Sequence, residues 1–257
     1  MSKQPVHRFY RHFREVPLSL RALFTGTLLV VGMGYLFALV YVYYSHAGLD
    51  GEPAVSVQDI AIAYGGSGEA SVLESALRSS MSDMADEAAM RELLEWLHGG
   101  GDRETYETTV RPIIESNCIA CHDGSDPHLS NLDGFDNIRK VTATDTGADV
   151  FTLVRVSHIH LFGLTFIFFV VGFIFSHAYM RPVWLKCTII LTPFLCVLAD
   201  VSSWYLTKLS SGFAWVVLVA GGLMAFSFAV MWFVSIYQMW FAKMPEDLVN
   251  RATSDHG

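Results

Sequence analysis

The sequence predicts an all-α membrane protein in which a small helical domain is inserted between the first and second of four transmembrane helices. The composition indicates a membrane protein, because 52% of the residues are apolar and only 16% are charged, against roughly 25% charged in soluble domains. Four apolar segments have about the 20-residue length that crosses a bilayer. Between the first and the second lies the polar stretch 46–154, whose apolar residues recur at helical spacing.

The four apolar segments are Ala22–Tyr44, Val156–Ala178, Val183–Ala199 and Phe213–Phe241. The first is longer than the roughly 7–15 apolar residues of a signal peptide, so we expect it to remain as an anchor. The expected organisation is an N-terminus (1–21), a first transmembrane helix (22–45), an inserted domain (46–154), transmembrane helices two to four (155–241) and a tail (242–257).

Positive charge predicts the orientation in the membrane. Lys and Arg are frequent in the N-terminus, the turn after the second segment and the tail, three regions that lie on one side of a four-helix protein. The residues are Lys3, Arg8, Arg11, Arg14, Arg21, Arg181, Lys186, Lys243 and Arg251. By the positive-inside rule we expect both termini in the cytoplasm and the inserted domain in the periplasm of a bacterium, in a multi-pass inner-membrane protein.

The inserted stretch is strongly acidic. It holds 20 of the 25 Asp and Glu residues and six Lys or Arg, a formal charge of −14. Such a surface repels nucleic acid and steers a partner with a basic docking surface, in a salt-dependent way. Within it, helices are expected at Met84–His98, ended by three glycines, at Thr105–Ser116 and at Phe135–Ala143.

The motif "CIACH", from Cys118 to His122, has three possible chemistries. A structural zinc site requires a second ligand pair, and His128 alone does not supply one. A thioredoxin-like disulfide belongs to a βαβ unit, and this stretch lacks strands. Covalent haem c requires two spaced thiols followed by a histidine that ligates iron, and CxxCH is that pattern. We expect one covalent haem c on Cys118 and Cys121, with His122 as proximal ligand; Cys187 and Cys196 fall in an apolar segment as small core residues.

The stretch "TYETTVRPIIESNCIACHDG" resembles the opening helix and haem-binding motif of c-type cytochromes. That family places a second iron ligand, often Met, downstream, but here no Met follows His122 before Met180. The upstream stretch "SSMSDMADEAAMRELLEWLHGGG" is similar to the family's ligand loop and final helix. The resemblance therefore implies a circularly permuted domain with Met81 as distal ligand and Met84 as the alternative. One alternative is a histidine as distal ligand, from His128, His98 or His158. Another is an iron with no distal protein ligand.

Histidines and an aspartate in the membrane segments raise the question of a second cofactor. His46, His158 and His160 lie near the outer ends of their segments, and His177 lies near an inner end. A b-type haem would have to pair His46 with His158 or His160, because segments three and four hold no histidine. We favour helix-end histidines at the headgroups over that haem or a copper site. Asp200 is a candidate proton acceptor for a quinol, although an ordinary helix cap is the simpler role.

The favoured function is a membrane-anchored monohaem cytochrome that carries single electrons on the periplasmic side. Four spans exceed what tethering requires, so we expect a subunit of a larger respiratory or photosynthetic complex, in contact with other membrane subunits and lipid. One alternative is a quinol:cytochrome c oxidoreductase with its site between the spans. Another is a haem-based membrane sensor, although the short tail offers no output domain.

Overall fold

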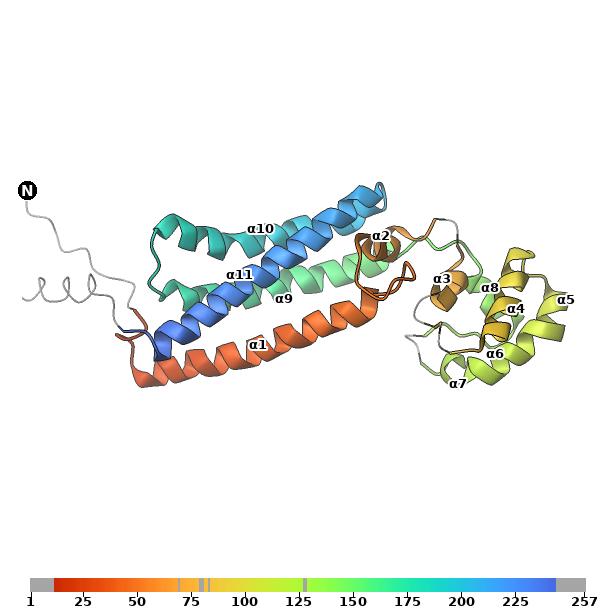
Figure 1. Ribbon diagram of the computed structural model, residues 1–257, viewed down its shortest axis with the longest axis horizontal. Helices are drawn as coiled ribbons and strands as arrows, with labels where there is room; N and C mark the ends of the chain where they lie inside the picture. The colour runs from red at the N-terminus through yellow and green to blue at the C-terminus, as the bar shows by residue number, and fades with distance from the viewer. Residues whose placement is uncertain (1–11, 69, 79–80, 83, 127–128, 244–257) are drawn as a thin grey trace, which may run out of the picture. The chain divides into compact units, whose positions relative to one another are not determined.

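The computed structural model describes residues 12–68, 70–78, 81–82, 84–126 and 129–243. Every regular element in these ranges is a helix, so the predicted all-α class is confirmed (Figure 1). Some residues used in the predictions lie outside the described ranges: Lys3, Arg8, Arg11, His128 and Arg251.

Four long helices are apolar enough to cross a membrane, as predicted. They are α1 (Leu18–His46), α9 (Val150–Ser176), α10 (Val183–Thr207) and α11 (Ala214–Trp240). Three of them extend beyond the apolar segments. Pro17 accepts from the Arg21 N–H at 3.1 Å, which begins α1 early. Asp149 accepts from the Thr152 N–H at 3.0 Å, which caps α9 ahead of its apolar run.

The third long helix corrects one prediction. The expected third segment ends at Ala199, but α10 continues through Asp200 and ends at Thr207. Asp200 ended the apolar run in the sequence, yet it is buried in the helix, with 7% of its surface exposed. The first strong helix breaker after it is Gly212, so backbone propensity allows the longer helix.

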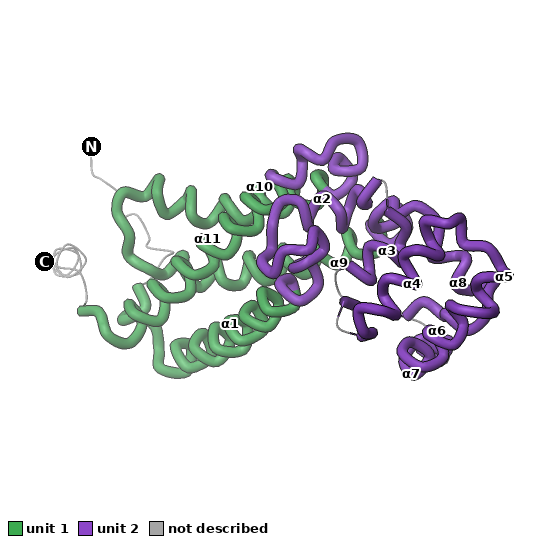
Figure 2. The backbone as a smooth tube through the Cα atoms, turned by 45° about the vertical axis from the view of Figure 1, so that its right-hand side comes forward, with its two compact units in different colours: residues 1–41, 154–203, 216–257 green, residues 42–153, 204–215 purple. Residues whose placement is uncertain are grey.

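The chain divides into two compact units, coloured separately in Figure 2. The membrane unit comprises Met1–Tyr41, Val154–Ser203 and Val216–Gly257. The inserted unit comprises Val42–Leu153 and Trp204–Trp215. The second piece of the inserted unit was not expected. It packs through the Trp204 ring, stacked on Tyr64 at 5.6 Å between centroids, and through Lys208, which donates to the Thr146 carbonyl at 2.9 Å.

Aromatic contacts hold the helices of the membrane unit together. Tyr35 of α1 stacks on Phe228 of α11, with ring centroids 4.2 Å apart. Trp232 of α11 donates its indole N–H to the Leu28 carbonyl of α1 at 2.7 Å. A Cβ on Gly32 would lie 2.7 Å from the Trp232 Nε1. Glycine at position 32 therefore allows α11 to approach α1, which is the packing role expected of small residues in membrane helices.

The segment before α1 inserts a histidine among the helix ends of the membrane unit. His12 is buried, and its Nδ1 accepts the Arg14 backbone N–H at 3.2 Å. Its Nε2 lies 3.3 Å from Gln238 Oε1, and that oxygen also accepts the Tyr179 N–H at 2.7 Å. Because Oε1 is an acceptor, the Nε2 of His12 carries the proton. The two contacts together select the neutral Nε2–H tautomer.

Acidification is therefore expected to destabilise the membrane unit through His12. Burial lowers the pKa of His12, outweighing the Gln238 hydrogen bond and the attraction of Glu15; the positive charges of Arg14 and Lys186 lower it further. The unfolded ring binds a proton below about pH 6.5, while the folded ring resists it, so stability present above that pH is lost as the pH falls. Thermal unfolding in detergent at about pH 7.5 and about pH 5.5 measures this loss.

The matched variant is His12→Gln, which cannot titrate. It should be less stable than the wild type at the higher pH, because the Arg14 contact changes, but its midpoint should fall less on acidification. Equal losses in the two proteins would mean that another group carries the pH dependence.

The inserted unit is built from short helices. They are α2 (Val57–Gly65), α3 (Val72–Arg78), α4 (Glu87–His98), α5 (Arg103–Thr105), the π-helix η1 (Tyr106–Val110), α6 (Arg111–Asn117), α7 (Ile119–His122), α8 (Phe135–Val141) and the 3₁₀ turn η2 (Ser211–Phe213). The expected helix at Met84–His98 begins later, because the Asp86 side chain accepts the Ala89 N–H at 2.8 Å and caps α4. The helix expected at Phe135–Ala143 ends at Val141.

One apolar core joins these short helices. Its fully or nearly buried members are Leu73, Leu77, Leu93, Trp96, Tyr106, Val110, Ile114, Leu132, Phe135 and Ile138. Trp96 of α4 lies 6.0 Å from the Tyr106 ring of η1, and Tyr106 meets Phe135 at 5.3 Å. Cys118 and Ile119 pack against this core as half-buried residues. The motif thus lies at the edge of the core.

Candidate haem-binding site

The CxxCH motif forms a single helical turn. The N–H groups of Cys121 and His122 both donate to the Cys118 carbonyl, at 3.1 and 2.9 Å. Residues spaced three and four apart lie on the same side of a helix, so this turn presents both thiols and the imidazole together. All four cysteines of the chain are free thiols in the structure; Cys118 is half-buried and Cys121 is exposed.

The loop after the motif determines the orientation of His122. Its Nδ1 donates to the Ser130 carbonyl at 2.7 Å, and the His122 carbonyl accepts the Leu132 N–H at 2.9 Å. A carbonyl only accepts, so Nδ1 carries the proton of the neutral ring and the lone pair is on Nε2. This is the arrangement found around metal-bound histidines, where the second nitrogen is held by an oxygen. Sequence reasoning missed Ser130, because a backbone carbonyl leaves no signal in residue type.

The glycine after the motif permits the loop to fold back. Gly124 has a φ of +87°, and a Cβ at this position would lie 2.6 Å from the Asn131 amide nitrogen. Both facts favour glycine, since other residues rarely adopt that backbone conformation. The return of the chain past Asn131 is what brings the Ser130 carbonyl to His122.

The thiols have features that bear on the other two chemistries of the motif. Burial raises the pKa of Cys118, so its thiol stays protonated at neutral pH. Redox-active CxxC cysteines have lowered pKa values instead. In the part of the chain that the structure describes, no three His, Cys, Asp or Glu side chains gather as a metal site would require. The raised pKa of Cys118 therefore differs from that of a redox-active CxxC cysteine.

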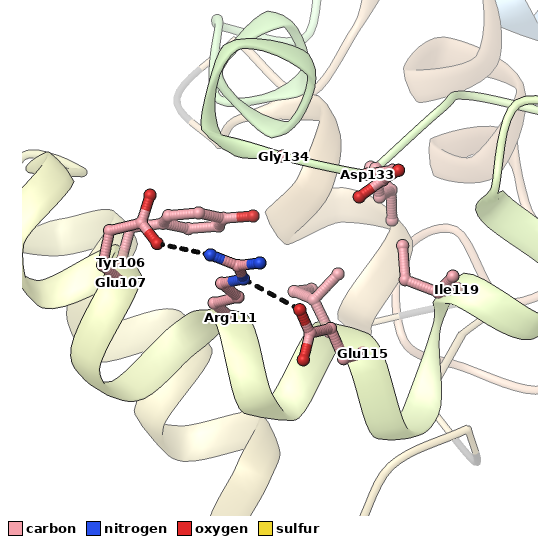
Figure 3. Close-up of a pocket in the computed structure, with 9 residues that line it drawn as sticks. Tyr106, Glu107, Arg111, Glu115, Ile119, Asp133 and Gly134 are labelled. Atoms are coloured by element: carbon pink, nitrogen blue, oxygen red, sulfur yellow. Dashed lines mark hydrogen bonds and ion pairs between the residues drawn. The ribbon is translucent and has the colours of Figure 1, made fainter.

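A small cavity adjoins the motif at Ile119 (Figure 3). It measures about 120 Å³, less than the roughly 300–1,000 Å³ of cofactor sites, so it does not itself hold a porphyrin. The Arg111 guanidinium beside it is paired with Glu107 at 3.0 Å and Glu115 at 2.8 Å. These two carboxylates raise the pKa of Arg111 further above its ordinary range. Figure 3 shows Arg111 with its two carboxylate partners next to the Tyr106 ring.

The two candidate distal methionines share one turn after α3. The Met84 N–H donates to the Met81 carbonyl at 3.1 Å. Met81 is half-buried, whereas Met84 is 59% exposed. A thioether that ligates iron in a protein lies in an apolar, enclosed setting. Exposure therefore ranks Met81 above Met84.

The three histidines that are alternative distal ligands lie in different parts of the chain. His98 lies with its Nε2 3.2 Å from Glu74 Oε1, and this carboxylate also pairs with Arg78 at 2.9 Å. His98 lines a cavity of about 470 Å³ along α4 that none of the CxxCH side chains lines. His158 belongs to the membrane unit, and His128 lies outside the described residues.

The membrane candidates are distributed over both units. The Nδ1 of His46 donates to the Val42 carbonyl at 3.0 Å in the inserted unit, and the Nδ1 of His160 donates to Val156 at 3.1 Å in α9. His158 is exposed. The b-type haem that would pair His46 with His158 or His160 stays the less favoured alternative. Asp200 is buried in α10, one helical turn from the buried Ser203, which the sequence reasoning did not single out.

One comparison with known proteins identifies a domain. Residues 149–246 match a family model, Aq_1264_TM, described as a transmembrane helical domain. The match covers α9, α10 and α11 and agrees with the length and hydropathy of these helices. The chain is a membrane protein whose apolar helices contact lipid. No curated protein matches the chain, and no solved structure does.

Proposed function

We propose that this protein is a membrane-anchored monohaem c-type cytochrome that carries single electrons on the periplasmic side, as a subunit of a larger respiratory or photosynthetic complex. The observation that carries the proposal is the CxxCH turn, with two free thiols and a histidine on one side and the His122 Nδ1 held by the Ser130 carbonyl. When bound, haem supplies one-electron iron chemistry.

The protein's own residues have distinct tasks in this proposal. Cys118 and Cys121 would hold the macrocycle, each thiol adding across one of its vinyl groups to give a thioether. His122 would offer its Nε2 lone pair to iron, and the Ser130 carbonyl holds the ring in that tautomer. The acidic surface of the inserted unit steers a basic redox partner, so association should weaken as the ionic strength rises.

The permuted order receives support from helix packing. Helix α4, which is similar to the family's final helix, packs on η1 through Trp96 and Tyr106. The connection between them is short: the Gly101 N–H donates to the Trp96 carbonyl at 3.0 Å, and the Trp96 indole donates to the Asp102 carbonyl at 2.9 Å. A turn this tight directly joins the helices that the family has at opposite ends of its domain.

The membrane unit supports assembly with neighbours. In the most apolar window of α1, 11% of the residues are buried within the chain, against 28% for each of the other three helices. The remaining apolar face of α1 is available to lipid or to helices of other subunits. The quinol:cytochrome c oxidoreductase stays the second candidate because Asp200 is a buried carboxylate in a membrane helix.

The experiment that tests the proposal uses the full chain, expressed with the bacterial haem-attachment machinery and purified in mild detergent. Haem staining after denaturing electrophoresis and a reduced pyridine haemochrome spectrum should show one covalent c-type haem. No covalent haem would overturn the proposal. An additional, extractable b-type haem would instead favour the oxidoreductase and a role for His46, His158 and His160.

Replacing the distal ligand should change the absorption spectrum and the reduction potential of the haem, while the haem stays covalently attached. In Met81→Ala we expect loss of the far-red ferric band of Met ligation and a lower reduction potential, by on the order of 0.1 V within the ≈0.8 V range that axial ligands span. Met84→Ala is the matched control and should leave both properties unchanged. Redox titration of the two variants measures the difference; the reverse result would make Met84 the ligand.

A further inference from the structure

We propose that Arg14 and Arg21, beside Trp240, form a binding site for the phosphodiester group of an anionic phospholipid. The site lies where α1 begins and α11 ends, two helix ends that lie side by side in the membrane unit (Figure 1). It is independent of the haem, because all of its residues belong to the membrane unit.

Trp240 is the common neighbour of the two arginines. The Arg21 guanidinium carbon lies 5.4 Å from the centroid of the Trp240 ring. Arg14 donates to the Trp240 carbonyl at 2.9 Å and to the Ala242 carbonyl at 3.0 Å. The Trp240 indole N–H donates to Thr25 Oγ1 at 2.9 Å, which holds the ring against α1. The two positive charges are therefore positioned by the hydrogen bonds of Arg14 and the cation–π contact of Arg21 with one tryptophan.

Neither arginine forms an ion pair with a carboxylate among the residues that the structure describes. By contrast, three arginines of the inserted unit are each paired with a carboxylate: Arg78, Arg103 and Arg111. The Arg21 Nε is buried, and no atom of the described chain accepts its hydrogen bond. An unmade hydrogen bond of this kind costs about 1–3 kcal/mol. The described part of the chain thus supplies no anion to Arg21, and an anion from another molecule would offset that cost.

The position of the site indicates which anion this is. Arg21 is in the first turn of a transmembrane helix and Trp240 is the last residue of another, so both are at the level of the lipid headgroups. Arginine binds phosphate oxygens through a planar fork. Two arginine charges beside one phosphodiester favour a headgroup with net negative charge over a zwitterionic one. An anionic phospholipid such as phosphatidylglycerol meets these conditions.

The test measures lipid binding to the full chain in detergent. Native mass spectrometry counts bound lipid while phosphatidylglycerol or phosphatidylcholine is added, and thermal unfolding is followed in parallel. The wild type should prefer phosphatidylglycerol, and Arg21→Gln should lower that affinity by roughly five- to tenfold, the effect of about one interfacial charge. Arg155→Gln is the matched control, because Arg155 lies near the start of α9, and this exposed arginine should not affect binding.

Each further result decides for or against the site. Arg21→Lys retains the charge without the planar fork and should bind with intermediate affinity; it also serves if Arg21→Gln fails to fold. Equal binding of the two lipids, or unchanged binding in Arg21→Gln, would overturn the proposal. Inorganic phosphate is the third probe: if it displaces the lipid and gives the same stabilisation, the site takes free phosphate and the lipid assignment is wrong.

Discussion

The double variant Cys118→Ser/Cys121→Ser should carry no covalent haem at all. Serine is close to cysteine in size, so the turn should still form through the bonds to the residue-118 carbonyl, which are backbone contacts. A serine hydroxyl forms no thioether link, and the loss is therefore chemical. Haem staining after denaturing electrophoresis measures it, with the protein level checked separately.

The chain provides its own controls for this experiment. Cys187→Ser and Cys196→Ser make the same change in α10, away from the motif, and should keep full staining. The single variants Cys118→Ser and Cys121→Ser should each retain at most one link, with reduced staining and a shifted haemochrome spectrum. Covalent haem that persists in the double variant would place the attachment elsewhere and remove the basis of the proposed function.

The transmembrane helices could be predicted from the sequence because each contains a long, predominantly apolar run, although the third holds Lys186 near its start. The ends could not, because local hydrogen bonds determine them. Asp149 extends α9 and Pro17 begins α1 outside the apolar runs. Asp200 stopped the expected third segment although the helix buries it. A hydropathy run records where water is excluded, whereas a helix ends where its backbone loses its partners.

The candidate site was predictable to a similar extent. The thiols and His122 could be recognised from residue type and spacing, because the CxxCH pattern of haem attachment is defined by these two features. The Ser130 carbonyl that orients His122 is a backbone atom, and it depends on the loop geometry at Gly124. The rank of Met81 over Met84 depends on burial, a tertiary property. The headgroup site at Trp240 required two chain segments about 220 residues apart to meet, which no local pattern reveals.

Truncation of Trp96 should produce the largest loss of stability in the inserted unit. The ring is 3% exposed, packs on Tyr106, and donates its indole N–H to the Asp102 carbonyl at 2.9 Å. Trp96→Ala removes these contacts and leaves a cavity in the core that supports α6 and the CxxCH turn, at a cost of about 3–5 kcal/mol. That is a large part of the roughly 5–15 kcal/mol that stabilises a typical domain.

Hydrogen exchange of the α6 amides measures this loss of stability in the inserted unit, without interference from the transmembrane helices. In Trp96→Ala, these amides should exchange faster, and haem incorporation should fall because the turn that follows α6 is less often formed. Trp96→Phe keeps the aromatic packing and loses the hydrogen bond to Asp102, so about 1–2 kcal/mol is expected. If α6 kept its protection in Trp96→Ala, α4 would not support the helix that leads into the CxxCH motif, and the proposed permuted order of the domain would lose its physical basis.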